Sequence, residues 1–222
     1  DLGELAAAPP TAEHVRPALM RALCAAGRPA EALDHYAQLR RRLAAKVYAR
    51  TSAYDAAIAT PLQREFEGRS ESLPPTLHLS VPLAQKLRYG ENPHQRAGLY
   101  GSFERSFEQL HGKELSYNNL VDVDAAVNLV QEFEDTSFVI IKHTNACGVG
   151  TAATVKESYL KGFQADTLSA FGGVLATNKE IDLAAAEEIN KLFFEILIAP
   201  AYETKALELL RSKKNRMILL QK

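Results

Sequence analysis

The sequence has 222 residues, of which 46% are hydrophobic and 24% charged, and its formal net charge is −1. This composition is typical of a globular protein of one or two domains, and a charge so close to zero does not indicate a nucleic-acid-binding face. No apolar run approaches the ~20 residues of a membrane span, and two distant cysteines, Cys24 and Cys147, do not suggest a disulfide framework. We therefore expect a cytoplasmic protein with neither a membrane nor a nucleic acid as partner.

The first 44 residues predict a helical hairpin after a short tail. Residues 14–26 and 30–47 each fit an amphipathic helix, and the segment Gly27-Arg28-Pro29 supplies a helix end followed by a helix start. The stretch Ala-Gly-Arg-Pro-Ala-Glu-Ala-Leu-Asp-His-Tyr (26–36) resembles one tetratricopeptide-type unit, as found in bacterial transcriptional activator domains. One such unit buries too little surface to be stable alone, so we expect it to pack on a neighbour or on the rest of the chain.

Residues 45–82 predict a connection between the hairpin and a second domain. The helical pattern continues to about residue 62, and the polar segment 63–82 contains Pro74-Pro75, which favours a linker.

From residue 83 to residue 222, short apolar strands alternate with helical patterns. The expected helices are 121–133, 152–163, 182–193 and 203–212, and the expected strands are 137–142, 173–177, 195–199 and 216–220. This alternation predicts an α/β fold with a mostly parallel sheet covered by helices.

The first candidate site is the pair Lys142-His143, at the end of the expected strand 137–142. Ligands of open α/β sheets bind at the carboxyl ends of strands, and His is the side chain whose ordinary pKa lies nearest neutrality. The pair suggests a proton-transferring base beside a fixed positive charge; the alternative is a solvated Lys next to a backbone-bonded His. Cys147, four residues after His143, allows a thiol nucleophile or half a zinc site, but the sequence has no second Cys/His cluster.

Three further segments combine polar side chains with glycine. Arg88 and Tyr89 lie in a polar run with Gly and Pro (87–95), which suits either phosphate binding by Arg or a solvated turn. Asn119 precedes a helix and could be an N-cap or a ligand contact. Phe171 and Gly172 come just before a strand, where the ring could stack on a flat ligand or fill the core, and glycine permits close backbone approach.

Taken together, these segments closely resemble a known family. Leu-Arg-Tyr-Gly-Glu-Asn-Pro-His-Gln (87–95), Lys-His-Thr-Asn-Ala-Cys-Gly (142–148), Ser-Ala-Phe-Gly-Gly (169–173) and Ile-Ala-Pro (198–200) occur in the order and spacing of the bifunctional purine biosynthesis family, which combines AICAR formyltransferase and IMP cyclohydrolase. Residues 45–55 also resemble the segment that links the two activities. The resemblance covers about residues 41–222.

The resemblance implies a fold, a reaction and roles for individual residues. The transformylase domain of the family has two cytidine-deaminase-like α/β halves without a metal, and it acts as a homodimer. It transfers a formyl group from 10-formyltetrahydrofolate to the 5-amino group of AICAR. By resemblance, His143 would be the base and Lys142 would support the developing charge. Arg88 and Tyr89 would bind the nucleotide. Asn119, Phe171 and Gly172 would line the substrate site.

Two departures from the family pattern set limits on the expected activity. The hairpin at 1–44 does not resemble the cyclohydrolase domain, and the domain at 83–222 corresponds to the first transformylase half, apparently truncated. We therefore expect no cyclohydrolase activity and an incomplete transformylase site in these 222 residues. The alternative is a non-catalytic nucleotide-binding or interaction protein derived from the family, and a third reading is a hydrolase that uses Cys147.

Overall fold

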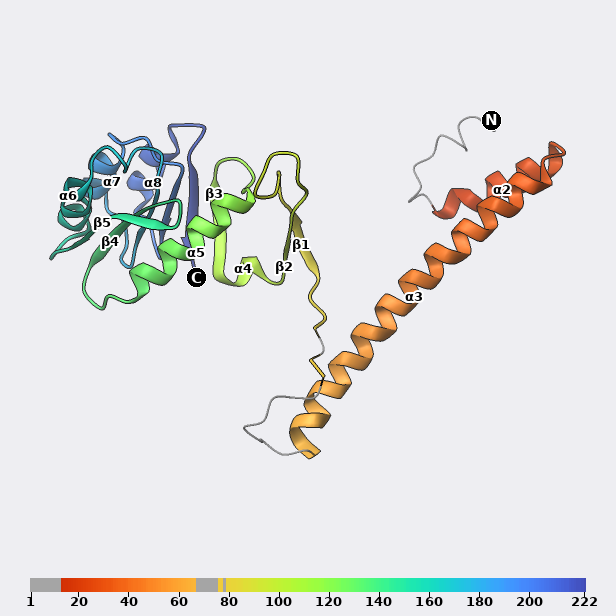
Figure 1. The fold of residues 1–222 in the computed structure, drawn as a ribbon. Helices are drawn as coiled ribbons and strands as arrows, with labels where there is room; N and C mark the ends of the chain where they lie inside the picture. Colours follow the sequence, from red (N-terminus) through yellow and green to blue (C-terminus); the bar gives the residue numbers. More distant parts are fainter. Residues whose placement is uncertain (1–12, 67–75, 78) are drawn as a thin grey trace. The chain divides into compact units, whose positions relative to one another are not determined.

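The computed structural model describes residues 13–66, 76–77 and 79–222. The chain divides into two compact units, Asp1–Ser80 and Val81–Lys222 (Figure 1). The tail at 1–12 and the Pro74-Pro75 segment of the expected linker lie outside the described residues.

The first unit is a hairpin of two α-helices of unequal length. A short 3-10 helix, η1 (Glu13–Val15), leads into α2 (Arg16–Ala25), and α3 extends without a break over Pro29–Phe66. Gly27, with φ 71°, takes the left-handed conformation after α2, which few other residues adopt at low cost. Leu19 and Leu23 of α2 are buried against Ala32 at the start of α3. The helices expected at 14–26 and 30–47 are thus present. The second helix, α3, continues without a break across the expected boundary between the hairpin (1–44) and the connecting segment (45–82).

The second unit is built on a six-stranded mixed sheet in the order β3-β8-β7-β6-β4-β5. β6 pairs in parallel with β7 and β7 with β8, whereas β3–β8, β4–β6 and β4–β5 are antiparallel. Strands β5, β6, β7 and β8 therefore run in one direction, and β3 and β4 in the other. The six strands are β3 (Phe107–His111), β4 (Ser137–Lys142), β5 (Asn145–Thr151), β6 (Val174–Thr177), β7 (Ile196–Ala199) and β8 (Met217–Gln221).

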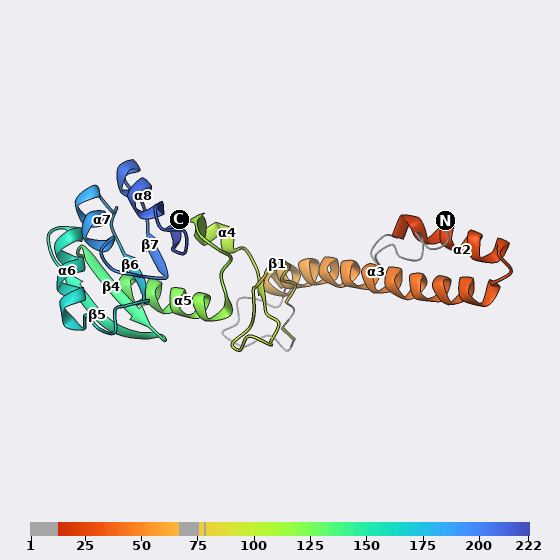
Figure 2. The same ribbon diagram turned by 90° about the horizontal axis from the view of Figure 1, so that it is seen from above.

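Helices cover both faces of this sheet, so the unit has three layers (Figures 1 and 2). α5 (Tyr117–Gln131) packs on one face, where its Val123 and Val127 join a buried cluster with Ile141 of β4. On the other face, three helices enclose a second buried cluster, α6 (Val155–Ala165), α7 (Leu183–Ile189) and α8 (Thr204–Arg211). The predicted α/β architecture is confirmed, with parallel pairing at the centre of the sheet and antiparallel pairing towards its edges.

The segment 83–111 contains elements that the sequence patterns did not separate. β1 (Leu83–Lys86) and β2 (Gly98–Tyr100) form a two-stranded antiparallel ribbon, and the polar run 87–95 lies in the connection between them. A short helix, α4 (Phe103–Ser106), leads directly into β3.

The largest departure from the expected elements is the strand β5. We expected a turn after Lys142 and then a helix from about residue 152, but residues 145–151 form a strand that pairs with β4 along its whole length. Glycine is depleted in strands, so Gly148 and Gly150 obscured the pattern. Both are needed because α6 packs directly on the strand: a Cβ at Gly148 would collide with the carbonyl oxygen of Gly162, and one at Gly150 with that of Ser158.

This strand changes where the Lys142-His143 pair lies. The pair is at a β-hairpin turn, not at a strand-to-helix junction. Because β4 runs antiparallel to β6, its carboxyl end lies at the edge of the sheet where β6 and β7 begin. The rule about the carboxyl ends of parallel strands therefore does not apply to Lys142 and His143, because β4 is antiparallel to its neighbours.

Candidate functional site

Three strand ends meet at this edge of the sheet. Lys142 ends β4, Gly173 directly precedes β6, and Glu195 directly precedes β7. Their backbones lie next to one another. Glu195 N–H donates to the Gly173 carbonyl (3.0 Å), and a Cβ on Gly173 would come within 2.9 Å of the Ile141 carbonyl oxygen. The close approach leaves no room for a side chain at position 173, while strand pairing joins β6 to β4 and to β7.

His143 and Thr144 form the two-residue turn between β4 and β5. Both have positive φ, 51° and 62°, as both central residues of a type I′ hairpin turn require. Two side chains bond back to the His143 carbonyl: Thr144 Oγ1 donates at 2.6 Å and Asn145 Nδ2 at 2.8 Å. Thr144 N–H donates to Asp122 Oδ1 of α5 at 2.7 Å. His143 is exposed on a turn whose backbone is thus bonded on several sides.

Lys142 connects the hairpin to the Phe171-Gly172 segment. The half-buried Lys142 donates from Nζ to the Phe171 carbonyl at 2.9 Å. Phe171 is 59% exposed, and the centre of its ring lies 5.1 Å from that of the Phe193 ring, with the two planes tilted by 40°. Gly172, with φ 75°, donates its N–H to the Phe193 carbonyl at 2.8 Å. Two segments separated by 29 residues are therefore in direct contact, and the residue whose carbonyl accepts from the ammonium group is an exposed aromatic one.

Asn119 joins the first turn of α5 to the start of β7. Ser116, and not an Asn or Asp, is the N-cap of α5, and Asn119 completes a capping box with it. The Asn119 amide nitrogen then donates to Glu195 Oε2 at 3.0 Å. Asn119 is buried, so its side chain serves both the helix start and the contact with Glu195.

Arg88 and Tyr89 contact each other and lie near the start of α5. Arg88 Nη2 donates to the Tyr89 hydroxyl (3.1 Å), and the guanidinium carbon lies 4.8 Å from the centre of the Tyr89 ring. Tyr117 N–H donates to the Tyr89 carbonyl (3.4 Å), and Asn118 Nδ2 donates to the Glu91 carbonyl (3.2 Å). The loop thus adjoins α5, whereas no contact joins Arg88 or Tyr89 to Lys142 or His143 in the described part of the chain.

Cys147 lacks the surroundings of a reactive thiol. It is half-buried on β5 beside the cluster formed with α6, and burial, reinforced by the charge of Asp166, raises its pKa although Lys142 opposes the shift. A raised pKa keeps the thiol protonated, and the thiolate is the nucleophile. The two roles considered for Cys147 from sequence therefore gain no support. Among the described residues, no three His, Cys, Asp or Glu side chains gather where a metal ion could bind.

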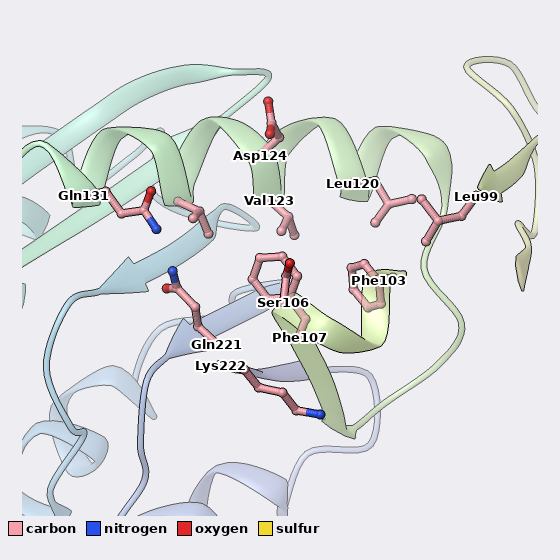
Figure 3. A pocket seen from close by; sticks show the side chains of 11 residues that line it. Leu99, Phe103, Ser106, Phe107, Leu120, Val123, Asp124, Gln131, Gln221 and Lys222 are labelled. Atoms are coloured by element: carbon pink, nitrogen blue, oxygen red, sulfur yellow. The ribbon is translucent and has the colours of Figure 1, made fainter. Parts of the chain in front are cut away.

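A separate hollow of about 370 Å³ lies along α5, beside α4 and the adjoining strands (Figure 3). Phe103, Phe107 and Val123 give it an apolar wall, and none of the sequence-predicted site residues line it. The hollow is therefore distinct from the cluster at the strand ends.

None of the helices in the described ranges is both long and apolar enough to cross a membrane.

Sequence reasoning did not single out Glu195, Asp122 or Thr144. Glu195 precedes an apolar strand and carried no motif of its own, and its role appears only through its contact with Asn119, 76 residues away. From sequence, Asp122 was only one polar residue of an expected helix, and its role appears only through the hydrogen bond that it accepts from Thr144 N–H. An i, i+3 spacing of polar groups, Asn119 and Asp122, on a helix that otherwise buries apolar side chains was the available signal.

Comparison with known proteins identifies the family. The profile of the AICARFT/IMPCHase bienzyme family matches residues 25–222, which begins earlier than the residue 41 expected from the motifs. The bifunctional purine biosynthesis protein PurH of Bacteroides thetaiotaomicron is 50% identical over 183 residues, covering 82% of this chain and 35% of the relative. The proteins of that name from Bacillus mycoides and Bacillus cereus are each 47% identical over 188 residues, covering 82% of this chain and 36% of the relative.

The chain thus spans about a third of the length of the curated relatives that it matches. The match nevertheless includes the segments that meet at the strand ends, namely the start of α5, the β4–β5 turn and the turns before β6 and β7, and also the 87–95 loop that adjoins α5. On this evidence the chain belongs to the AICARFT/IMPCHase bienzyme family.

Proposed function

We propose that this chain supplies part of the site that transfers a formyl group from 10-formyltetrahydrofolate to AICAR in purine biosynthesis. The observation that carries the proposal is the junction at the ends of β4, β6 and β7, where the Lys142 ammonium is bonded to the Phe171 carbonyl. Membership of the family supports the choice of reaction. The cytidine-deaminase-like class of the fold, the cytoplasmic location and a homodimeric assembly are parts of the same proposal.

His143 would act as the base of the transfer. The 5-amino group of AICAR is a poor nucleophile because its lone pair is delocalised into the imidazole ring, so a base must remove a proton as the amine attacks. His143 is exposed at the turn. The side chains of Thr144 and Asn145 donate to the His143 carbonyl, and Asp122 accepts from the N–H of the next residue, Thr144. Lys142 is held by the Phe171 carbonyl and would place a positive charge where negative charge develops on the formyl oxygen or the leaving folate nitrogen.

Other residues would bind the nucleotide. Arg88 lies over the Tyr89 ring, an arrangement that leaves guanidinium N–H groups free to donate to a phosphate. The exposed Phe171 ring would stack on the flat base, and Gly172, which lacks a side chain, would let the backbone approach it. The buried Asn119 would line the site together with its partner Glu195.

Calorimetric titration of AICAR tests the nucleotide part of the proposal. The wild-type chain is expected to bind, and Arg88→Ala is expected to weaken binding roughly 10-fold to 100-fold, the range for losing hydrogen bonds to a charged group. Arg105→Ala, which removes an exposed arginine of α4, is the matched control and should leave the affinity unchanged. Equal affinities for wild type and Arg88→Ala, or no binding by a folded chain, would contradict the proposal.

The catalytic part is tested separately. His143→Ala is expected to keep AICAR affinity but to lose any formyl transfer that the chain supports, while His14→Ala, an exposed histidine of the helical unit, should change neither. Transfer that survives in His143→Ala would show that another group is the base.

A further inference from the structure

The turn that carries His143 has an unfavourable backbone. Type I′ turns favour Asn-Gly or Gly-Gly because both central residues need positive φ, yet here the residues are His and Thr. Thr144 is β-branched, and a β-branched residue with φ of 62° is an outlier. Such a conformation persists only where surrounding contacts over-determine it, and it occurs preferentially at functional sites.

The contact from outside the turn comes from α5. Asp122 Oδ1 accepts from Thr144 N–H at 2.7 Å, a charge-assisted hydrogen bond to the residue with the least favourable φ. The two other side-chain bonds of the turn, from Thr144 Oγ1 and Asn145 Nδ2, both end on the His143 carbonyl and lie within the hairpin itself. Of these bonds, the one from Asp122 is therefore the one that fixes the turn relative to another element.

The helix that presents Asp122 is itself anchored at the same sheet edge. One turn earlier on α5, Asn119 is bonded to Ser116 at the helix start and to Glu195 before β7. The first two turns of α5 thus connect the start of β7 to the β4–β5 turn. A displacement of Asp122 would move the turn away from the strand ends where Lys142 meets Phe171.

We propose that Asp122 is a positioning residue for His143: its carboxylate holds the strained β4–β5 turn so that the imidazole faces the AICAR site. The role of the imidazole rests on the proposed function, whereas the holding of the turn does not. If Asp122 instead contributed to folding in general, its removal would lower the stability of the whole sheet and not only of the β4–β5 turn.

The experiment uses Asp122→Ala, with Asp124→Asn, an exposed neighbour on α5, as control. By NMR, the Thr144 amide is expected to exchange with solvent at least ~10-fold faster in Asp122→Ala, because a hydrogen-bonded amide is protected until its bond opens. The His143 imidazole resonances should shift, while the Ile140 amide inside β4 should keep its exchange rate. Asp122→Asn retains an oxygen acceptor without the charge, so its Thr144 amide should exchange at a rate between those of wild type and Asp122→Ala.

A second variant separates the strained turn from other effects. Thr144→Gly removes the penalty of positive φ, so the double variant Asp122→Ala/Thr144→Gly is expected to return the His143 resonances towards their wild-type positions. Unchanged Thr144 exchange and unchanged His143 resonances in Asp122→Ala would overturn the proposal. Loss of protection at Ile140 as well would also overturn it, since the role would then be structural.

AICAR titration in the same samples links the turn to the substrate. Asp122→Ala is expected to bind AICAR as wild type does but to lose the AICAR-induced shift of the His143 resonances. If Arg88→Ala leaves AICAR binding intact while the turn still responds to Asp122→Ala, the proposed function fails and the role of Asp122 in holding the turn stands. If AICAR shifts His143 equally in wild type and in Asp122→Ala, the positioning role fails and the proposed function stands.

Discussion

Both units of this chain contain helices with periodic apolar side chains, but most of these side chains are buried in the α/β unit and only a few in the helical unit. In the α/β unit, strand and helix faces meet in two clusters, so that Leu197 and Phe138 are fully buried. In the helical unit, the buried set is small, and Leu33 is 67% and Tyr54 67% exposed on α3. The difference shows that a periodic pattern predicts a helix or strand, whereas burial requires a second layer to cover the apolar face.

Substituting one leucine in each unit gives the largest expected contrast. Leu197→Ala removes a fully buried side chain of β7 and is expected to lower the free energy of unfolding of the α/β unit by ~2–5 kcal/mol, through lost burial and a cavity. Leu33→Ala, the same change on exposed α3, should alter stability by less than ~0.5 kcal/mol. Urea unfolding followed by circular dichroism measures both, with hydrogen exchange to assign each transition to its unit. Equal effects would show that Leu33 is covered.

Substitutions at Gly27 and Gly148 are expected to change stability less than Leu197→Ala. Asn should cost less than Ala at position 27 and more than Ala at position 148. At Gly27 there is open space but φ is positive, so Gly27→Ala should cost about 1–2 kcal/mol, and Gly27→Asn less, because Asn tolerates the left-handed region. At Gly148 a Cβ would collide with the Gly162 carbonyl, so Gly148→Ala should cost ~1–3 kcal/mol and Gly148→Asn more.

Thermal unfolding of the four glycine variants tests the ranking. If Asn costs less than Ala at position 148, strand β5 and helix α6 are not in close contact. If Asn costs more than Ala at position 27, open space does not surround that turn.

Two carboxylates give the smallest effects, which depend on pH and salt. Hydrogen bonding to Arg28 lowers the pKa of Glu31 in the helical unit, and hydrogen bonds from Ser169, then from the Leu168 N–H, lower that of Asp166 in the α/β unit. Since each folded pKa lies below its unfolded value, each carboxylate contributes stability above the unfolded pKa of ~4, and this is lost as pH falls through the folded pKa.

Glu31→Gln and Asp166→Asn, compared with wild type in chemical unfolding from pH 7 to pH 3, should each show a stability difference that vanishes at the acid end. The two should differ in salt. About 1 M NaCl screens the exposed Arg28–Glu31 ion pair, so the Glu31 difference should shrink, while the Asp166 difference, which rests mainly on hydrogen bonds to neighbouring residues, should remain. Equal salt sensitivity would mean that the charge of Lys142 dominates at Asp166.

Much of the second unit could be predicted from sequence because its strands are apolar runs. Phe138-Val139-Ile140-Ile141 and the runs at β7 and β8 are buried on both faces of a covered sheet, which local composition alone indicates. β5 could not be predicted, since its glycines are explained only by the backbone of α6 against them. The same limit applies to the site: the motifs identified Lys142 and Phe171 separately, and their contact across 29 residues required the fold.

The sequence by itself determined the longer helices of both units, the apolar strands β4, β6, β7 and β8, and the ordered motifs by which the chain is placed in its family. Only the tertiary structure decided that β4 runs against β6, that His143 and Thr144 form a turn with positive φ, and that Asn119 and Asp122 reach Glu195 and Thr144. The physical reason is range. Periodicity and composition act through neighbours in the chain, whereas strand direction, close glycine contacts and hydrogen bonds between elements depend on residues that only folding brings together.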